Sequence, residues 1–287
     1  MIEVNGNTKL TGIIGNPLGH SLSPLMQNTF FDTLGLNSIY IPLKVTPENL
    51  EQVIAGLWAL GFSGVNVTIP YKEEIIKYLT GITPEAEIIG AVNTLIRKED
   101  GFWGDNTDGR GFINALTGET GWVPKDKIIV ILGSGGSARA VGISLAYRGV
   151  KKIFLINRNL KKAAELASTI KRLGVSAEIL DWENPLVNKL TAESDLIINT
   201  TPLGMKPANG QMPPINTELM SPGQLIVDLI YNPLETRLLR EARGRGCRVQ
   251  NGLGMLIHQG VLSFEIWTGR RPSLAGIKSK LEAALND

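Results

Sequence analysis

The sequence predicts an α/β protein of two domains, the second of which contains a doubly wound parallel sheet. The chain has 287 residues, which is close to two domains of roughly 150 residues each. Short β-branched runs alternate with longer segments of helical period, a pattern typical of parallel strands joined by crossover helices. A polar, turn-forming stretch at 117–126 separates the two halves and predicts a hinge there.

In the first half, the predicted elements alternate between strand and helix. The strands are expected at 12–15, 39–45, 65–69 and 94–97, and the helices at 24–34, 47–60, 73–78 and 109–116. Ser23 precedes Pro24, so we expect Ser23 to cap the first helix with proline at the first helical position. The Ser21 hydroxyl is then free to contact a ligand.

The second half offers six candidate strands, which suits a doubly wound sheet. They are expected at 128–132, 153–156, 177–180, 196–199, 225–229 and 248–250. Two helices at 254–268 and 274–285 follow, and we expect them to pack back onto the first domain. The predicted domains are therefore 1–108 completed by 252–287, and 109–251.

The composition is that of an ordinary globular protein. Lys and Arg number 29 against 27 Asp and Glu, so the net charge of +2 argues against a nucleic-acid or anionic-membrane partner. Cys247 is the only cysteine, which favours a reducing compartment. No signal-peptide pattern and no apolar run of roughly 18 residues is present, so we expect a cytoplasmic protein. The sequence leaves open whether it is a monomer or a homodimer.

A glycine-rich turn follows the strand at 128–132. The residues from Gly133 to Ala138 read G-x-G-x-x-A and open an apparent helix. Gly133 permits a tight turn, Gly135 lets backbone amides approach a pyrophosphate, and Ala138 allows close packing of helix on strand. This context predicts a Rossmann-type dinucleotide-binding domain; the alternative is a glycine-rich turn without a ligand.

The end of the next strand indicates which dinucleotide binds. NAD-type sites place a carboxylate there for the ribose 2′-hydroxyl, whereas this chain has Asn157-Arg158-Asn159, followed by Lys161 and Lys162. An arginine without a carboxylate suits a 2′-phosphate, so we predict NADP as the cofactor. The alternative is a solvated basic helix start.

Three polar clusters in the first half are candidates for a reaction site. Alternation in the strand at 65–69 places Asn66 and Thr68 on one face, and Lys72 follows Pro70. Lys72 alone also fits an exposed first-turn lysine, and the Asn- and Asp-rich stretch at 104–109 also fits an ordinary turn. His20 and His258 have no partners at metal-ligand spacing, so no metal is predicted.

Together with the nucleotide turn, these clusters resemble the shikimate dehydrogenase family over nearly the whole chain and in family order. The matching motifs are Ser21-Leu-Ser23-Pro, Asn66-Val-Thr68-Ile-Pro-Tyr-Lys72, Gly90-Ala-Val-Asn93-Thr, Asn106-Thr-Asp108-Gly, Gly133-Ser-Gly135-Gly136, Asn157-Arg158 and Gly252-Leu-Gly-Met-Leu-Ile-His-Gln259. The resemblance implies NADPH-dependent, reversible reduction of 3-dehydroshikimate to shikimate in aromatic amino acid biosynthesis.

The resemblance also implies a role for individual residues. Lys72 is the acid/base group and Asp108 its partner. The substrate residues are Ser21, Ser23, Asn66, Thr68, Asn93, Tyr231 and Gln259. The cofactor residues are Gly133, Ser134, Gly135, Gly136, Ser137, Ala138, Asn157, Arg158, Asn159, Lys162, Thr201, Leu229, Gly252 and Met255.

Two other functions remain open from the sequence. One is a quinate/shikimate dehydrogenase that accepts NAD, although Arg158 and the Ser21–Ser23 pair weigh against it. The other is an NADPH-sensing regulator without turnover, although the presence of both Lys72 and Asp108 speaks against it.

Overall fold

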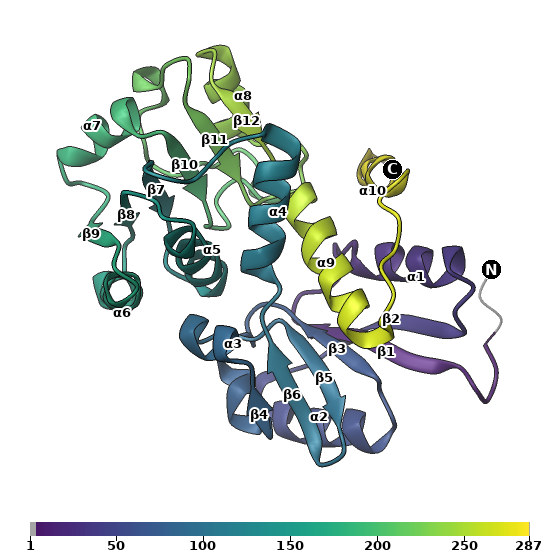
Figure 1. Cartoon of the computed structure of the whole chain (residues 1–287). Coiled ribbons are helices and arrows are strands. Elements are labelled where there is room, and N and C mark those ends of the chain that lie inside the picture. Colours follow the sequence, from purple (N-terminus) through teal and green to yellow (C-terminus); the bar gives the residue numbers. More distant parts are fainter. Residues whose placement is uncertain (1–3, 287) are drawn as a thin grey trace. The chain divides into compact units, whose positions relative to one another are not determined.

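The computed structural model describes residues 4–286 and divides the chain into two compact units. The first unit runs to Gly111 and resumes at Leu256–Ala284, and the second comprises Phe112–Met255. Both unit boundaries fall inside helices, α4 (Asp108–Thr120) and α9 (Leu253–Thr268) (Figure 1).

The first unit contains a mixed six-stranded sheet in the order β2-β1-β3-β5-β6-β4. Its strands are β1 (Lys9–Gly15), β2 (Ser38–Lys44), β3 (Gly64–Val67), β4 (Gly81–Ile82), β5 (Thr94–Lys98) and β6 (Gly101–Asp105). Strand β1 pairs in parallel with β2 and β3, whereas β5 is antiparallel to both β3 and β6. The expected parallel pairing therefore holds for β1, β2 and β3 but not for β5.

The β5–β6 hairpin was not predicted from the sequence, because alternating strand and helix segments favour strands that are joined by crossover helices. Lys98 pairs with Gly101, so only Glu99 and Asp100 lie between the two strands. Gly101, the first residue of β6, has a positive φ of 150°, and a glycine directly after a short polar loop between two strands is a hairpin signal. The two-residue strand β4 and the six-residue helix α3 (Pro84–Ile89) were also missed, since neither is long enough to show a period.

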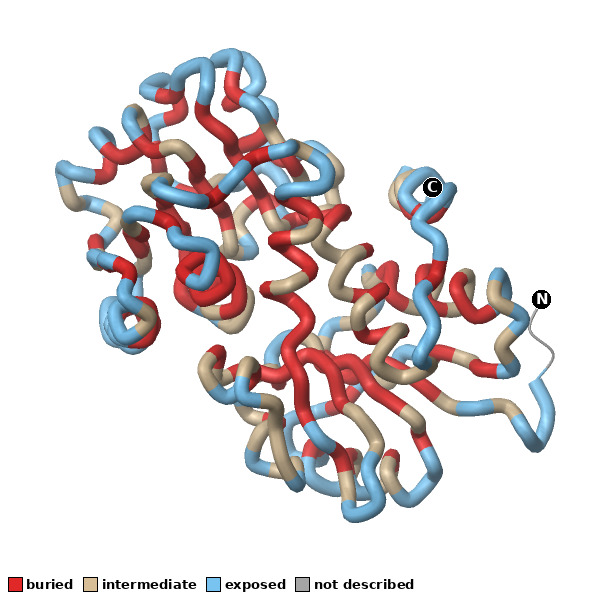
Figure 2. Tube along the Cα trace, in the orientation of Figure 1, coloured by how far each residue is buried: buried red, intermediate tan, exposed pale blue. Residues whose placement is uncertain are grey.

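The first unit has further helices, of which α1 (Ser23–Thr33) and α2 (Leu50–Ala59) contact the sheet. The others are α10 (Ile277–Asn286) and the 3-10 turns at Pro47–Asn49 and Glu74–Tyr78. The core lies between the sheet and α2, and it includes the buried side chains of Ile14, Leu50, Val65, Ile75, Leu95 and Phe102. Figure 2 shows the buried central strands of each unit as red segments of the trace.

The predicted cap of α1 is wrong by one residue. Ser23 is the first residue of the helix, and Leu22 occupies the N-cap position with its backbone already in the right-handed helical region. Leu22 is buried, which draws it into the first turn. The Ser23 N–H donates to Ser21 Oγ at 3.3 Å, so Ser21 and not Ser23 supplies the oxygen at this helix start.

The helices at the C-terminal end of the chain complete the first unit. Phe264 of α9 packs against Phe30 and Phe31 of α1, with ring centroids 5.6 and 5.0 Å apart. The Trp267 indole N–H donates to the Leu95 carbonyl at 2.9 Å. Residues 256–284, near the C-terminal end of the sequence, therefore pack with residues of the N-terminal part of the chain to form the first unit.

The second unit is a doubly wound parallel sheet, as predicted. Its strand order is β12-β11-β10-β7-β8-β9, and every pair is parallel. The strands are β7 (Ile128–Leu132), β8 (Lys152–Ile156), β9 (Ser176–Leu180), β10 (Leu196–Asn199), β11 (Leu225–Asp228) and β12 (Arg248–Gln250). The helices are α5 (Gly136–Tyr147), α6 (Leu160–Arg172), α7 (Leu186–Glu193) and α8 (Arg237–Gly244), with a 3-10 turn at Thr217–Leu219.

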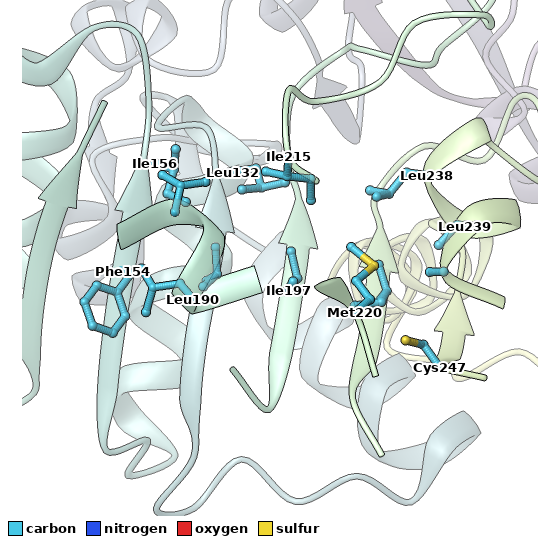
Figure 3. Close-up of a cluster of buried hydrophobic side chains, with 14 of the residues drawn as sticks. Leu132, Phe154, Ile156, Leu190, Ile197, Ile215, Met220, Leu238, Leu239 and Cys247 are labelled. Carbon is cyan, nitrogen blue, oxygen red and sulfur yellow. The ribbon is translucent and has the colours of Figure 1, made fainter. Parts of the chain in front are cut away.

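The four inner strands, β7, β8, β10 and β11, are buried along almost their whole length and read as near-continuous apolar runs, which explains why they were found from the sequence. One of the two faces of the sheet is filled by the cluster shown in Figure 3, in which Leu132, Ile156 and Ile197 of the strands lie near Leu190 and Leu238 of the helices. Cys247 lies in the same cluster, and burial raises the pKa of its thiol.

The predicted turn at 117–126 is partly helical. Helix α4 continues to Thr120 and ends before Gly121, whose φ of 64° closes the helix. The hydroxyls of Thr117 and Thr120 donate to the carbonyls four residues earlier, so these turn-forming residues are satisfied within the helix. The linker to β7 is therefore shorter than the sequence predicted.

None of the helices within residues 4–286 is long and apolar enough to cross a membrane.

Candidate active site

Lys72 and Asp108 form an ion pair in the first unit. Lys72 Nζ lies 2.6 Å from Asp108 Oδ2, and the two side chains are 15% and 6% exposed. The structure excludes the interpretation of Lys72 as an exposed first-turn lysine. A charge-assisted hydrogen bond of this length with little access to water holds the ammonium in a fixed position.

The second oxygen of Asp108 is held by Asn93, which follows α3 and precedes β5. Asn93 Nδ2 donates to Asp108 Oδ1 at 2.8 Å and to Thr107 Oγ1 at 2.9 Å. Asn93 Oδ1 accepts from the Thr107 backbone at 2.9 Å. Asn106 fixes the same loop, because its Oδ1 accepts from the Asp108 backbone and its Nδ2 donates to the Ala91 carbonyl. The stretch that reads as a turn therefore presents one carboxylate in a defined orientation.

Asn66 of β3 lies in a buried network of hydrogen bonds, only some of whose residues were predicted from the sequence. Its Nδ2 donates to the Asn93 carbonyl at 3.0 Å and to Ser263 Oγ at 3.1 Å, and its Oδ1 accepts from the Tyr40 hydroxyl at 2.8 Å. Ser263 Oγ also lies 2.8 Å from Thr94 Oγ1. Thr94 was singled out only as the neighbour of Asn93 in its motif. Tyr40 and Ser263 were not predicted, because each falls at a core position of its strand or helix, where a polar residue carries no sequence signal.

Tyr40 connects two of the expected substrate residues. It is 1% exposed, and burial raises the pKa of its hydroxyl well above the ordinary value, while a hydrogen bond from the Ser23 side chain acts in the opposite direction. Its hydroxyl therefore contacts Ser23 on α1 and Asn66 on β3. The structure thereby joins Ser23 to the Asn66 network.

Gln259 of α9 reaches the same group of side chains. Gln259 Oε1 accepts from Asn93 Nδ2 at 3.3 Å, and its Nε2 donates to the Leu256 carbonyl at 2.8 Å. Thr68 follows β3 and is half-buried next to Gly15, with its methyl group toward that glycine. The structure thus brings Lys72, Asn66, Asn93, Asp108 and Gln259 into one polar cluster, which we call the lysine–aspartate cluster.

The glycine-rich turn of the second unit lies where the sequence predicted it, between β7 and α5. Gly133 has a φ of 111°, and a Cβ there would lie 2.5 Å from Thr200 Oγ1, so both backbone and packing require glycine. Gly135 is different, because its φ of −79° suits any residue and its Cβ would meet nothing within 4 Å. The space beside Gly135 at the start of α5 is therefore open and suits a phosphate group.

The end of β8 is joined to this turn. Asn157 Nδ2 donates to Ser134 Oγ at 2.6 Å and to the Asn159 carbonyl at 2.8 Å. Asn159 caps α6 by accepting from the Lys162 backbone. Arg158 is exposed between the two asparagines. Asn157 and Asn159 therefore shape the loop, and the Arg158 guanidinium is left accessible to an anion.

The ends of β10 and β11 are joined by Asp228. Its carboxylate, which is fully buried, accepts hydrogen bonds from Asn199 Nδ2, the Ile230 backbone and Thr236 Oγ1 at 3.0, 3.1 and 2.7 Å. Burial raises its pKa to about 6, and these hydrogen bonds act in the opposite direction. Asn199 Oδ1 in turn accepts from the backbone and hydroxyl of Thr201.

The remaining expected cofactor and substrate residues of this unit follow the same strand ends. Leu229 and Tyr231 are half-buried just after β11. A Cβ at Gly252 would lie 1.9 Å from the Leu229 carbonyl oxygen, so Gly252 is explained by this close approach alone. Met255 is half-buried in the first turn of α9. Asn199 and Asp228 were not predicted as site residues, because each falls at the end of a predicted strand whose other residues are apolar.

Within residues 4–286, no group of three or more His, Cys, Asp or Glu side chains is arranged to hold a metal ion.

The basic residues of α8 lie on the exposed face of the helix. Arg237 pairs with Glu241, and Arg240 and Arg243 pair with Glu235, while Leu238 is buried. The arginines of α8 therefore form an exposed, ion-paired face of this helix.

Comparison with known proteins matches the chain to one family over most of its length. The model of the shikimate dehydrogenase substrate binding domain matches residues 13–95. The shikimate / quinate 5-dehydrogenase model matches residues 120–211, and the shikimate 5′-dehydrogenase C-terminal domain model matches residues 252–282.

Individual relatives match over almost their whole length. A shikimate dehydrogenase (NADP(+)) of Desulforamulus reducens is 45% identical over 93% of this chain and 92% of its own. A crystal structure of a shikimate dehydrogenase in complex with NADP+ is 43% identical, with a TM-score of 0.92 over 99% of this chain and 98% of that one. The shikimate 5-dehydrogenase of Thermus thermophilus in complex with NADP(H) and shikimate is 35% identical, with a TM-score of 0.86 over 96% of this chain and 100% of that one. The chain therefore belongs to the shikimate dehydrogenase family.

Proposed function

We propose that this protein is an NADP-dependent oxidoreductase that reversibly reduces 3-dehydroshikimate to shikimate, a step in the biosynthesis of chorismate and the aromatic amino acids. Relatives that cover nearly all of the chain carry this name, and solved relatives hold NADP and shikimate. The observation that carries the proposal within this chain is the contact of 2.6 Å between Lys72 Nζ and Asp108 Oδ2 in a cluster of amides and hydroxyls.

In this mechanism the lysine–aspartate cluster handles the proton. Reduction of a ketone to a secondary alcohol needs a hydride at carbon and a proton at oxygen, and NADPH supplies the hydride when it is bound. Lys72 Nζ donates the proton to the carbonyl oxygen, and in the reverse direction it accepts the hydroxyl proton. Asp108 orients the ammonium and accepts a hydrogen bond from a neighbouring hydroxyl of the substrate.

The neutral polar side chains of the cluster recognise the substrate. The Ser21 and Ser23 hydroxyls bind the carboxylate, and Asn66, Thr68, Asn93 and Gln259 bind ring hydroxyls, with Tyr231 as a further substrate residue. Buried amides that are oriented by the protein discriminate strongly against an analogue that lacks a hydroxyl, because such an analogue leaves them unpaired. The hydrogen bonds from Asn66 Nδ2 to the Asn93 carbonyl and Ser263 Oγ fix the orientation of the Asn66 amide toward the substrate.

The second unit holds the cofactor in this proposal. Residues Gly133–Ala138 bind the pyrophosphate at the start of α5, where free N–H groups and the helix dipole favour negative charge. The open space at Gly135 fits this group. Arg158 binds the 2′-phosphate together with Asn157, Asn159 and Lys162, and residues Thr201, Leu229, Gly252 and Met255 lie near the nicotinamide.

The proposal assigns substrate binding to a domain of residues 1–108 with 252–287 and NADP binding to residues 109–251. The division of the chain into two compact units supports this assignment. The match of the substrate binding domain model to residues 13–95 supports it as well.

Assays of shikimate and quinate, each with NADP and with NAD, test the proposal. We expect shikimate with NADP to give the highest kcat/KM by at least about tenfold. A preference for quinate or for NAD would favour a quinate/shikimate dehydrogenase. Binding of NADPH without turnover of either compound would favour a regulator and overturn the proposed activity.

A further inference from the structure

Gly111 lies inside helix α4 and contacts the backbone of Gln259 on α9. A Cβ at Gly111 would lie 2.6 Å from Gln259 N, 2.7 Å from its Cβ and 2.8 Å from its Cα. All three distances are below 3.0 Å, and ordinary van der Waals contact begins at 3.4 Å. The two helices therefore approach at this point more closely than any side chain at position 111 would allow.

Glycine is an unfavourable residue in a helix interior, so its presence at position 111 calls for a specific reason. Gly111 is helical and its N–H donates to the Thr107 carbonyl at 2.9 Å. It has no positive φ, so its backbone conformation does not require glycine. The close approach of Gln259 is the feature of the described structure that excludes a Cβ here.

We propose that Gly111 is a positioning residue for substrate recognition, because its bare backbone lets α9 approach α4 until the Gln259 side chain reaches Asn93. This inference rests on the proposed function, in which Gln259 and Asn93 bind ring hydroxyls of the substrate. Gln259 Oε1 accepts from Asn93 Nδ2 at 3.3 Å, a distance near the upper limit of a hydrogen bond.

A side chain at position 111 would push Gln259 away from Asn93. The atoms in the way are the backbone and Cβ of Gln259, which move only with the helix. To restore ordinary contact, α9 would have to move by about 0.8 Å.

Substitution of two glycines of the same helix provides a matched test. Gly118 also lies in α4, but it is exposed and a Cβ there would meet nothing within 4 Å. Gly111→Ala and Gly118→Ala therefore make the same chemical change in the same helix. We expect Gly111→Ala to raise the KM for shikimate by at least about tenfold while the KM for NADP stays within about twofold of wild type. We expect Gly118→Ala to leave both constants unchanged.

A double variant separates positioning from a loss of stability. In Gln259→Ala the backbone contact with position 111 remains, but the side chain that Gly111 positions is gone. We expect Gly111→Ala to raise the KM for shikimate by no more than about threefold in the Gln259→Ala background. A full tenfold further rise there would show that Gly111 acts through something other than Gln259.

The outcomes also distinguish this inference from the proposed function. Failure of the wild-type protein to oxidise shikimate with NADP would refute the proposed function. An active wild type with an unchanged KM for shikimate in Gly111→Ala would refute only the inference. An insoluble Gly111→Ala protein beside a soluble Gly118→Ala protein would also count against it, because the contact would then serve folding and not recognition.

Discussion

Lys72 Nζ and Asp108 Oδ2 are 2.6 Å apart although the two residues are separated by 36 positions in the sequence. Lys72 follows β3, and Asp108 is the first residue of α4. Asn93 fixes the other oxygen of Asp108, so each carboxylate oxygen has a donor of its own. Such a pair presents an ammonium with a defined direction, which is what proton transfer to a bound ketone requires.

The substitution Asp108→Asn tests the role of this carboxylate. Both carboxylate oxygens of Asp108 accept hydrogen bonds. Whichever oxygen the amide nitrogen of the asparagine replaces, that nitrogen faces another donor, Lys72 Nζ or Asn93 Nδ2. We expect kcat to fall at least about tenfold because the ammonium loses its orienting charge, while the KM for NADP stays unchanged. Asp100→Asn, at the exposed tip of the β5–β6 hairpin, is the control. Wild-type turnover in Asp108→Asn would remove the carboxylate from the mechanism.

The two glycines of the nucleotide turn are expected to respond differently to alanine. Gly135→Ala adds a methyl group to open space, so the melting temperature without cofactor should equal that of wild type, whereas Gly133→Ala should lower it. In Gly135→Ala the KM for NADP should rise at least about tenfold, because the methyl group takes the place of a phosphate. The increase of melting temperature on adding NADP should shrink accordingly. Undiminished NADP affinity in Gly135→Ala would contradict the pyrophosphate assignment.

Arg158→Ala tests the choice of cofactor. The guanidinium is exposed at the end of β8, and loss of a charge-assisted contact with a 2′-phosphate corresponds to roughly 10- to 100-fold in the KM for NADP. The KM for NAD, which has no such phosphate, should not change. Helix α6 begins two residues after Arg158. Lys161→Ala removes an exposed cation from the first turn of α6 and serves as the control. An equal loss with both cofactors would speak against recognition of the 2′-phosphate.

Asp228 predicts a pH dependence of stability. Its pKa is raised from 3.8 to about 6 in the folded protein, so folding favours the protonated carboxyl. The resulting stabilisation is complete below pH 3.8 and is lost as the pH rises through about 6. The shift corresponds to about 3 kcal/mol in the free energy of unfolding.

Urea unfolding of the wild type and of Asp228→Asn between pH 4 and pH 8 measures this contribution. The amide mimics the protonated carboxyl, because it accepts from Asn199 and Ile230 and donates to Thr236 Oγ1. We expect the wild type to lose stability relative to the variant across this range, by about 3 kcal/mol. Curves that stay parallel would show that Asp228 is ionised at all these pH values.

The sequence predicted the second unit well and the first unit less well, for a physical reason. Strands such as β7 and β10 are covered on both faces and read as short apolar runs, and they were placed to the residue. In the first unit, β4 has two residues and β6 returns from β5 by a tight hairpin, so neither shows the pattern of a crossover unit.

The site residues divide in a similar way. Lys72, Asp108 and Gln259 are found because they belong to motifs of the shikimate dehydrogenase family, and the structure places them in one cluster. Tyr40 and Ser263 carry no such signal, since each occupies a core position whose polar partner comes from a distant part of the chain. Their partners become visible only when the strands and α9 are assembled.

The most direct test of the account is the kcat of shikimate-dependent NADP reduction in Lys72→Ala, measured beside wild type after both proteins are shown to be folded. Lys72 is the group that gives and takes the proton in this account, so its removal should lower kcat at least about a hundredfold. The KM for NADP should stay near the wild-type value, because the nucleotide turn belongs to the other unit. A kcat for Lys72→Ala equal to that of wild type would contradict the account.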